Sequence, residues 1–154
     1  MSVVMDIAFN EVVIGGEKTA DLKYGDVNEA KVHPMIEEYF GSTVMNTKMT
    51  KGKYCVYDYE SLDLTTRYEL KSRRVKHNAY PTTIIQQHKI TQGAVGAERL
   101  ILLFLFTDGL YHIVYEPMLF STFDKSAFTR WRDGRPENQI VYNIPIKCLT
   151  KVVL

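Results

Sequence analysis

The sequence predicts an α/β fold in which a mixed central sheet is flanked by helices. Three observations favour this fold: an early helical pattern, short alternating segments after it, and a continuously apolar run over residues 100–106. A strand that is apolar on both faces needs cover on both sides, which places this run in a sheet between two layers. No repeat, linker or low-complexity segment divides the chain, so we expect one domain over residues 1–154.

The first predicted element is a helix that begins near Asp26. Asp26 and Glu29 have the spacing of a capping box, apolar residues follow at helical spacing, and Gly41 is a typical C-terminal stop. Pro34 lies inside this segment and is expected either to kink the helix or to split it in two.

Three short alternating segments follow this helix and predict an antiparallel meander of strands. They span residues 42–47, 53–60 and 65–75. The turn between the second and third strands is expected over residues 61–64, and this turn sets which residues lie opposite one another.

The next two elements are a helix and a buried hairpin. Residues 82–92 fit a short helix, although their isoleucines and threonines also suit a strand. Apolar runs over 100–106 and 110–115 then meet across Asp108-Gly109, a dipeptide typical of a type I′ hairpin. The helix that precedes the central strand in the chain should therefore form a second helical layer on the sheet.

Composition and motifs exclude several classes of protein. The chain is 45% hydrophobic and 24% charged, as in globular proteins, and its net charge of +1 argues against indiscriminate coating of nucleic acid. Cys55 and Cys148 form no zinc or disulfide framework, and residues 1–13 lack the features of a signal peptide. No Walker A or GxGxxG motif is present. We expect an intracellular protein, in the cytoplasm or nucleus, with no membrane partner and no nucleotide cofactor.

Charged residues alternate along the second and third predicted strands. The predicted register pairs Glu60 with Thr65, Asp58 with Arg67 and Val56 with Glu69. Since residues two apart share a face, one face should carry Asp58, Glu60, Arg67, Glu69 and Lys71. The other face should carry Tyr57, Tyr59, Tyr68, Leu70 and Ser72.

Two carboxylates held side by side repel each other unless a cation lies between them. Mg²⁺ prefers oxygen ligands and is often held by one or two carboxylates plus a substrate phosphate. A lysine beside the ion can stabilise a metal-bound hydroxide or the charge that develops on phosphorus. Asp58, Glu69 and Lys71 are therefore a minimal set for hydrolysing a phosphodiester. The alternative is that these charges are ordinary cross-strand ion pairs on a solvated face.

Asp58, followed by Glu69-Leu70-Lys71 on the next strand and preceded by a helix bearing Glu29, resembles the PD-(D/E)XK nuclease superfamily. Many restriction endonucleases, Holliday-junction resolvases and phage exonucleases have this fold. The resemblance covers roughly residues 26–115 through the order of elements, and it implies a restriction-endonuclease-like αβββαβ core.

The resemblance also implies a role for each matching residue. The implied catalytic set is Asp58, Glu69, Lys71 and Glu29. Asp58, Glu69 and the backbone carbonyl of Leu70 would bind Mg²⁺, with Mn²⁺ as a substitute, and Lys71 would position or activate water. Glu29 would serve a second metal or orient the lysine. Because no proline precedes Asp58, Asp63 stays open as a rival for the aspartate role, and a homodimer is expected since duplex DNA presents two strands.

Basic and polar residues near these positions are candidates for contact with nucleic acid. They are Arg73, Arg74, Lys76, His77, Gln86, Arg130, Arg132 and Arg135, with Gln87 and Lys89 as further candidates. Trp131, beside a predicted Asp133-Gly134 turn, is expected to anchor a last helix over 120–131 rather than to stack on a base. Residues 139–153 should add one or two closing strands.

The sequence therefore predicts a magnesium-dependent nuclease, with an endonuclease acting on DNA favoured and structured or junction DNA as one option. Two alternatives stay open. One is a non-catalytic nucleic-acid-binding or assembly protein with this fold or another mixed α/β fold, for which salt-sensitive binding without magnesium dependence would be typical. The other is an RNA endonuclease of the same superfamily, which the near-neutral charge does not distinguish.

Overall fold

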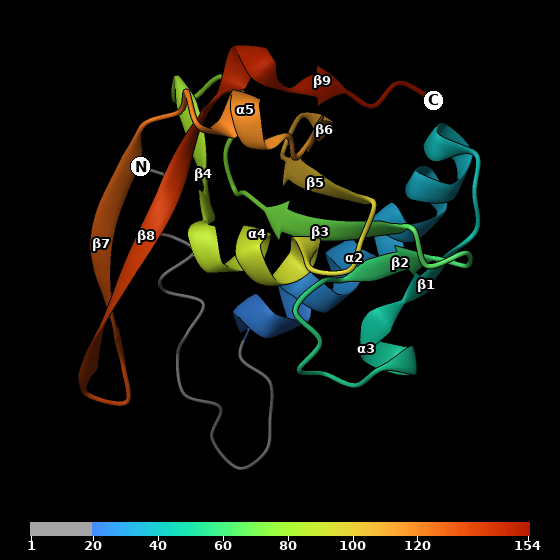
Figure 1. Cartoon of the computed structure of the whole chain (residues 1–154), viewed down its shortest axis with the longest axis horizontal. Coiled ribbons are helices and arrows are strands. Elements are labelled where there is room, and N and C mark those ends of the chain that lie inside the picture. The colour runs from blue at the N-terminus through green and yellow to red at the C-terminus, as the bar shows by residue number, and fades with distance from the viewer. Residues whose placement is uncertain (1–19) are drawn as a thin grey trace.

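The computed structural model describes residues 20–154, in four helices, nine strands and one 3-10 turn (Figure 1). The helices are α2 (Ala20–Phe40), α3 (Thr47–Thr50), α4 (Gln87–Ala94) and α5 (Pro117–Phe120), and the 3-10 turn is η1 (Ile146–Cys148). The strands are β1 (Val44–Asn46), β2 (Tyr59–Ser61), β3 (Thr66–Ser72), β4 (Thr82–Gln86), β5 (Arg99–Phe106), β6 (Gly109–Val114), β7 (Lys125–Arg132), β8 (Arg135–Pro145) and β9 (Thr150–Lys151). Residues 1–13, for which a signal peptide is not expected, lie outside the described residues.

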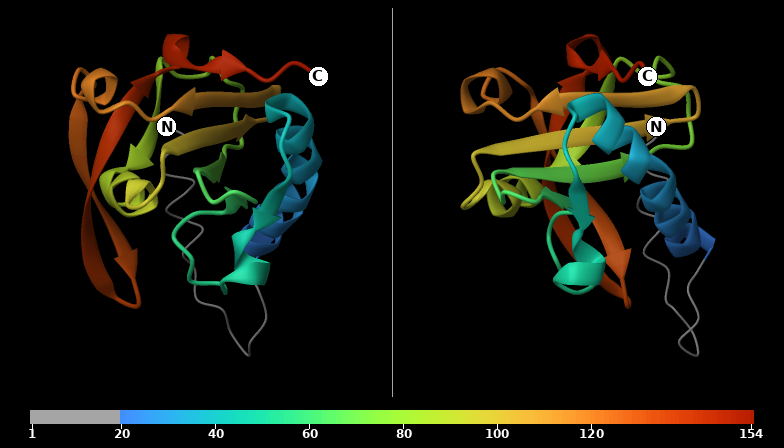
Figure 2. Two further views of the ribbon diagram at one scale, coloured as in Figure 1. Left: turned by 45° about the vertical axis from the view of Figure 1, so that its right-hand side comes forward. Right: turned by 90° about the vertical axis from the view of Figure 1, so that its right-hand side faces the viewer.

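A six-stranded mixed sheet forms the middle layer, in the order β1-β2-β3-β5-β6-β9. The meander β1-β2-β3 is antiparallel, as predicted, and β5 then runs parallel to β3. A second sheet has the strand order β4-β8-β7, and no hydrogen-bonded ladder joins it to the first sheet. In two views α2 and α4 lie on opposite sides of the central strands (Figure 2). The predicted α/β architecture with a mixed sheet between helices is therefore confirmed.

Two apolar clusters join the layers, one on each face of the six-stranded sheet. On one face Val32 and Ile36 of α2 pack in the same cluster as Leu103 of β5. On the other face Ile90 of α4 packs in a second cluster with Phe104 of β5 and with residues of the smaller sheet. Residues 100–106 are at most 7% exposed, so the prediction of a central strand covered on both sides is confirmed.

The pairing of β2 with β3 differs from the predicted register by two residues. Tyr59 lies opposite Tyr68 and Glu60 lies opposite Arg67, instead of Glu60 opposite Thr65. The reason is the turn, which begins one residue later because the Asp63 carboxylate accepts hydrogen bonds from Ser61 Oγ and from the Thr65 backbone N–H. A two-residue shift keeps each strand side chain on its predicted face, and it brings Asp58 beside Glu69 rather than Arg67.

The N-terminal helix is longer than predicted. It begins at Ala20, so Asp26 is not its N-cap, and Pro34 lies inside this one helix without splitting it in two. The predicted stop at Gly41 is confirmed, because Gly41 has a φ of +70° and its N–H donates to the Glu37 carbonyl at 3.0 Å.

Three other predicted elements are wrong in part. Residues 82–86 form the strand β4, and only the second half of the predicted helix, from Gln87, is helical. Residues 53–58 are irregular instead of strand, and the predicted helix over 120–131 is replaced by β7. Pairing with β8 along the whole of β7 supplies backbone hydrogen bonds that overrule the local helical pattern.

The two predicted Asp-Gly turns both join the strands of a hairpin, but their backbone geometries differ. The β5–β6 turn has Thr107 and Asp108 as its loop residues, and neither is among the described residues with positive φ, so the predicted type I′ geometry is wrong there. In the β7–β8 turn Asp133 and Gly134 have φ values of +53° and +73°, which type I′ requires. This turn closes a ribbon that extends to one side of the molecule (Figure 1).

Candidate active site

Asp58 and Glu69 come together where β2 begins. Asp58 directly precedes β2, and its N–H donates to the Tyr68 carbonyl at 2.9 Å. Its Oδ2 accepts a hydrogen bond from the Leu70 N–H at 2.8 Å. The carboxylate therefore takes the place that a backbone carbonyl would have if β2 continued alongside β3. Glu69 is 3% exposed, and its Oε1 has no hydrogen-bond partner in the described structure. The two carboxylates predicted to bind metal are therefore neighbours at one sheet edge.

Two lysines approach Glu69 from different elements. Lys71 Nζ lies 3.3 Å from Glu69 Oε2, and Lys89 Nζ of α4 lies 3.8 Å from the same oxygen. Burial lowers the pKa of Lys71, and the positive charges of Lys89 and Arg73 lower it further against the opposing pull of Glu69. A lysine with a lowered pKa releases its proton more readily than an exposed one.

Glu29 reaches the same cluster from α2. The residue is 7% exposed, and its Oε2 lies 2.5 Å from Lys48 Nζ of α3. Tyr59 fixes this part of the helix, since its hydroxyl donates to the Glu29 carbonyl at 2.5 Å. Burial acts to lower the pKa of Lys48, but its hydrogen bond to Glu29 and the charges of Glu29, Asp58 and Asp26 outweigh it and raise the pKa. The predicted auxiliary acid is thus in electrostatic contact with Asp58.

The surroundings raise the pKa of Asp58 to about 7. Burial is the largest cause, followed by the negative charges of Glu69 and Glu29, while the Leu70 N–H and Lys71 oppose the shift. Acidic groups whose pKa is raised in this way concentrate at functional sites. There, a bound ligand can relieve the repulsion between neighbouring carboxylates.

The donor set fits a hard divalent cation. Among residues 20–154 no group of three or more His, Cys, Asp or Glu side chains is placed to hold a metal ion. Mg²⁺ nevertheless needs only one or two carboxylates, because it keeps several waters. The Leu70 carbonyl faces the same edge as its N–H, which donates to Asp58, and so adds a third oxygen there. The Oε1 atom of Glu69, which has no hydrogen-bond partner in the described structure, would be available to such an ion.

Asp63, the rival for the aspartate role, lies elsewhere. It is exposed in the β2–β3 turn, beyond the opposite end of β2 from Asp58. Hydrogen bonds from Ser61 and Thr65 lower its pKa and tie it to the turn. Asp58 is therefore the aspartate that the fold brings to Glu69.

The basic residues after β3 have varied surroundings. Arg73 is 3% exposed and donates to the Ile84 carbonyl at 2.7 Å, so this guanidinium joins β3 to β4 and is not available to a phosphate. Arg74 is exposed with its guanidinium over the Tyr24 ring, and Lys76 is exposed. His77 Nδ1 lies 2.6 Å from Oδ2 of Asp108, so this imidazole is tied to the β5–β6 turn. Of this group Arg74 and Lys76 stay candidates for nucleic-acid contact.

Arg130 and Arg135 lie on one face of the β7–β8 ribbon, and Trp131 lies on the other. Arg130 Nε lies 3.0 Å from Glu137 Oε2 on the inner face, and Arg135 is exposed near the tip, while the side chain of Arg132 lies outside the described structure. Trp131 is 65% exposed, so the prediction that it packs in the core is wrong. Its partner across the ribbon is Pro136, and no third layer covers that face in the described residues.

Of the three candidates around α4, Lys89 contacts the cluster, through Glu69. Gln86 is the last residue of β4, and Gln87 is the first residue of α4. Lys48, by contrast, was not predicted at all. Its position depends on α3, a four-residue helix that the alternating pattern of that region did not indicate.

The geometry gathers Glu29, Asp58, Glu69 and Lys71, with Lys48 and Lys89 at the margins. None of the helices in the described part of the chain has the length and apolar character needed to cross a membrane. No family model, curated protein or solved structure matches the chain. Only the geometry and chemistry of the cluster therefore bear on its function.

Proposed function

We propose that the protein is a magnesium-dependent nuclease that hydrolyses phosphodiester bonds, with DNA as the favoured substrate and an endonucleolytic cut. The observation that carries this proposal is the pairing of two adjacent carboxylates, one with a pKa of about 7 and the other with an unpartnered buried oxygen. A divalent cation between Asp58 and Glu69 would offset the repulsion that raises the pKa of Asp58, and it would also give the unpartnered Glu69 oxygen a partner.

The residues divide the work by position. Asp58 and Glu69, with the Leu70 carbonyl, would hold the ion, which supplies Lewis-acid stabilisation and lowers the pKa of a bound water. Lys71, 3.3 Å from Glu69 Oε2, would orient the attacking water or offset charge on the phosphoryl oxygens. Lys89 adds positive charge on the α4 side. Glu29 would tune the acidity of Asp58 and act as the auxiliary acid.

The order of elements supports the same proposal. Helix α2, strands β1, β2 and β3, helix α4 and strand β5 follow the αβββαβ order that the superfamily resemblance implies. The short helix α3 and the strand β4 are additions between these elements. Asp58, Glu69 and Lys71 fall at the second and third strands, and Glu29 falls on the first helix, as the resemblance requires.

The cleavage test uses wild type, Asp58→Asn, Lys71→Ala and, as matched control, Glu60→Gln on the same sheet face. Plasmid, linear, single-stranded and four-way-junction DNA and a structured RNA are incubated with Mg²⁺ or Mn²⁺. The proposal expects wild type and Glu60→Gln to cut at least one substrate and the other two variants to lose that activity. Absence of cleavage in wild type on every substrate, with folding intact by circular dichroism, would overturn it.

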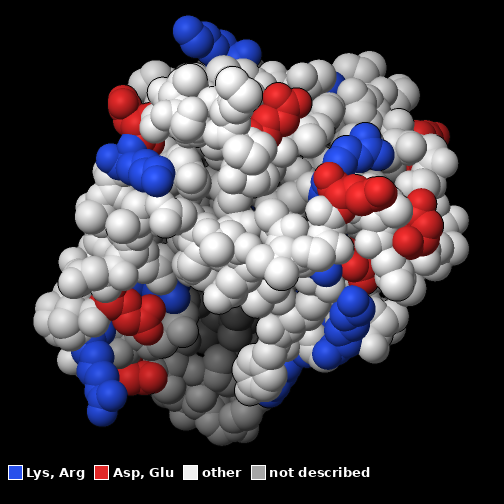
Figure 3. All heavy atoms as spheres, in the orientation of Figure 1, with Lys and Arg blue, Asp and Glu red and all other residues white. Residues whose placement is uncertain are grey.

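One observation favours a non-catalytic nucleic-acid-binding or assembly protein as the second candidate. Lys71 and Lys89 flank Glu69, and Lys48 pairs with Glu29, so ion pairs partly neutralise the acids without a metal. Positive and negative side chains are interspersed on the face drawn in Figure 3, which gives no broad basic track there. Salt-sensitive binding to DNA that ignores Mg²⁺ would support this candidate. A homodimer is part of the nuclease proposal, and light scattering with and without duplex DNA tests it.

A further inference from the structure

A pocket lies beside α4, between this helix and the smaller sheet. It has a volume of about 600 Å³ and is formed by α4 and the β8 strand of the smaller sheet. Volumes of about 300–1,000 Å³ are typical of small-molecule sites. The proposed catalytic mechanism uses none of its lining residues.

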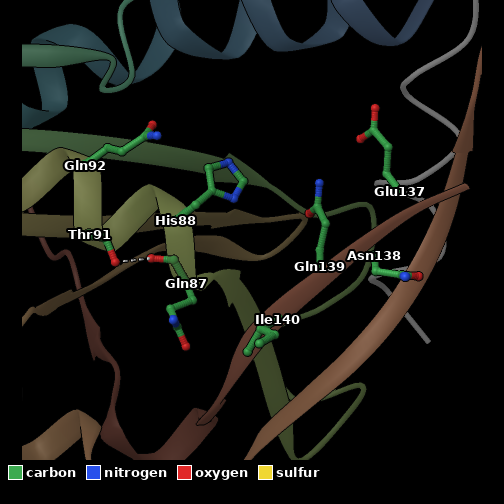
Figure 4. A pocket seen from close by; sticks show the side chains of 8 residues that line it. All are labelled: Gln87, His88, Thr91, Gln92, Glu137, Asn138, Gln139 and Ile140. Atoms are coloured by element: carbon green, nitrogen blue, oxygen red, sulfur yellow. Dashed lines mark hydrogen bonds between the residues drawn. The ribbon is translucent and has the colours of Figure 1, made fainter.

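Side-chain amides dominate this pocket. Four carboxamides line it, Gln87 and Gln92 from α4 and Asn138 and Gln139 from β8. His88 points from α4 across the gap toward Gln139 (Figure 4). A carboxamide offers both donors and an acceptor, which is the pattern needed to read the edge of a nucleobase.

The side chain of Gln139 has a hydrogen-bond acceptor to which no group in the described structure donates. This acceptor, Oε1, is buried. A buried acceptor without a donor costs free energy that a ligand N–H would recover. The exocyclic amino groups of adenine, cytosine and guanine are donors of this kind.

The lining disfavours a phosphate and favours a neutral ring. Glu137 is the lining residue with a formal charge, and Arg130 Nε pairs with its Oε2 at 3.0 Å, so the lining residues offer no cation to a phosphate. Burial lowers the pKa of His88, and Lys89, Lys71 and Arg130 lower it further, so the imidazole is neutral at pH 7. A neutral imidazole at the mouth of the pocket can stack on one face of a base.

Helix α4 connects this pocket to the candidate active site. Lys89 lies 3.8 Å from Glu69 Oε2, and its chain neighbour His88 lines the pocket. Lys71 and Glu69 both influence the pKa of His88, so the two sites share one electrostatic environment. A nucleotide held in the pocket would therefore lie close to a phosphate at the cluster.

We propose that the pocket between α4 and β8 binds one nucleobase of the substrate strand beside the candidate active site. This inference rests on the proposed nuclease function and names its substrate class. A base that enters the pocket must leave its stack, so the substrate carries unpaired nucleotides, as single strands, junctions and frayed ends do. Fully paired duplex is the poorer substrate.

The first test uses neutral nucleosides, which carry no phosphate for the catalytic cluster. Adenosine, guanosine, cytidine and thymidine are titrated into wild type, His88→Ala, Gln139→Leu, Asp58→Asn and a matched control, Asn78→Leu, and side-chain amide signals are followed by NMR. The inference expects saturable shifts with at least one nucleoside in wild type, Asp58→Asn and Asn78→Leu. It expects their loss in His88→Ala and Gln139→Leu. Absence of any saturable shift in wild type would overturn it.

The second test moves an abasic site through a single-stranded oligonucleotide. At one fixed position from the cut, loss of the base should weaken binding to wild type about 10-fold or more. His88→Ala and Gln139→Leu should bind intact and abasic strands alike, while Asn78→Leu should behave as wild type. If the protein cuts the strands but binds them equally well wherever the abasic site lies, the pocket inference is overturned and the nuclease proposal stands. Nucleoside binding without metal binding or cleavage keeps the pocket and overturns the nuclease.

Discussion

Glu60 and Glu69 are buried glutamates on the same face of one hairpin, yet their surroundings differ. Each Glu60 oxygen has its own cation, with Lys51 Nζ 2.7 Å from Oε1 and Arg67 Nε 3.2 Å from Oε2. The contact with Glu60 is close enough to raise the pKa of Lys51. For Glu69 both lysines approach Oε2, and Oε1 is left without a partner beside Asp58.

The difference separates a structural ion pair from a site with room for a ligand. The interpretation of the charged face as cross-strand ion pairs holds for Glu60 and Arg67, which lie directly opposite each other. It does not hold for Asp58 and Glu69, two like charges whose repulsion contributes to an Asp58 pKa of about 7. Changes at the two glutamates should therefore have opposite consequences for stability and for metal binding.

The largest expected effect is on cleavage. Lys71→Ala should lower the cleavage rate by about 10²–10⁴-fold, because it removes the cation beside the proposed water and phosphate. Lys51→Ala removes a cation from Glu60 and should leave the rate near wild type. Single-turnover cleavage rates measure both, and an equal loss in the two variants would contradict the division between the glutamates.

The next effect is on stability at the paired glutamate. Arg67→Met leaves Glu60 with only Lys51 and removes bonds from the guanidinium to the Gly93 and Val95 carbonyls. The free energy of unfolding should fall by about 3–5 kcal/mol, as for other broken buried pairs. Glu69→Gln should cost far less, because it removes repulsion with Asp58. Urea unfolding of both variants checks the order, and a larger loss in Glu69→Gln would reverse it.

Stability should also depend on pH through Asp58. A carboxyl whose folded pKa is about 7, against an ordinary value of 3.8, binds a proton more tightly in the folded state, so stability falls as pH rises toward 7. Relative to Asp58→Asn, wild type should lose about 2–3 kcal/mol between pH 5 and pH 8 without metal. Thermal and urea unfolding across this range measure the difference. A pH-independent difference would show that Asp58 is not perturbed.

The smallest expected effect concerns Lys48. Lys48→Met removes the positive charge paired with Glu29 and makes the cluster more negative. Magnesium affinity at pH 8 should then rise by about 3-fold, since partly exposed charges act through a high effective dielectric. Met49→Ala, an exposed change on the same helix, is the control. A drop in affinity would show instead that Lys48 holds Glu29 in place for the ion.

The charged face was predicted correctly although the predicted register was wrong, because an error of two residues leaves every strand side chain on the same face. The hydrogen bonds of Asp63 moved the turn by one residue, and the resulting two-residue shift left Asp58, Glu69 and Lys71 on one face. Tyr57 is an exception: it precedes β2, and its ring packs 4.4 Å from the Arg67 guanidinium on the charged side, not with Tyr59.

What the sequence did not predict depends on contacts between distant segments. Lys48 reaches the cluster from α3, and no local pattern marks it as a neighbour of the acids. Lys89 was expected only as a contact for nucleic acid, and its approach to Glu69 depends on how α4 packs. The strands β4 and β7 form because both pair with β8, which lies far along the chain. Trp131 is exposed because it faces outward on that ribbon, a fact that its hydrophobicity alone does not reveal.

The most direct measurement is calorimetric titration of Mg²⁺ into wild type, Asp58→Asn and Glu60→Gln at pH 7. The account predicts saturable binding with proton release in wild type and Glu60→Gln, because ligation must deprotonate Asp58, whose pKa is about 7. It predicts loss of binding in Asp58→Asn. Equal titrations in all three proteins, or a loss in Glu60→Gln that matches Asp58→Asn, would contradict a metal site at Asp58 and Glu69.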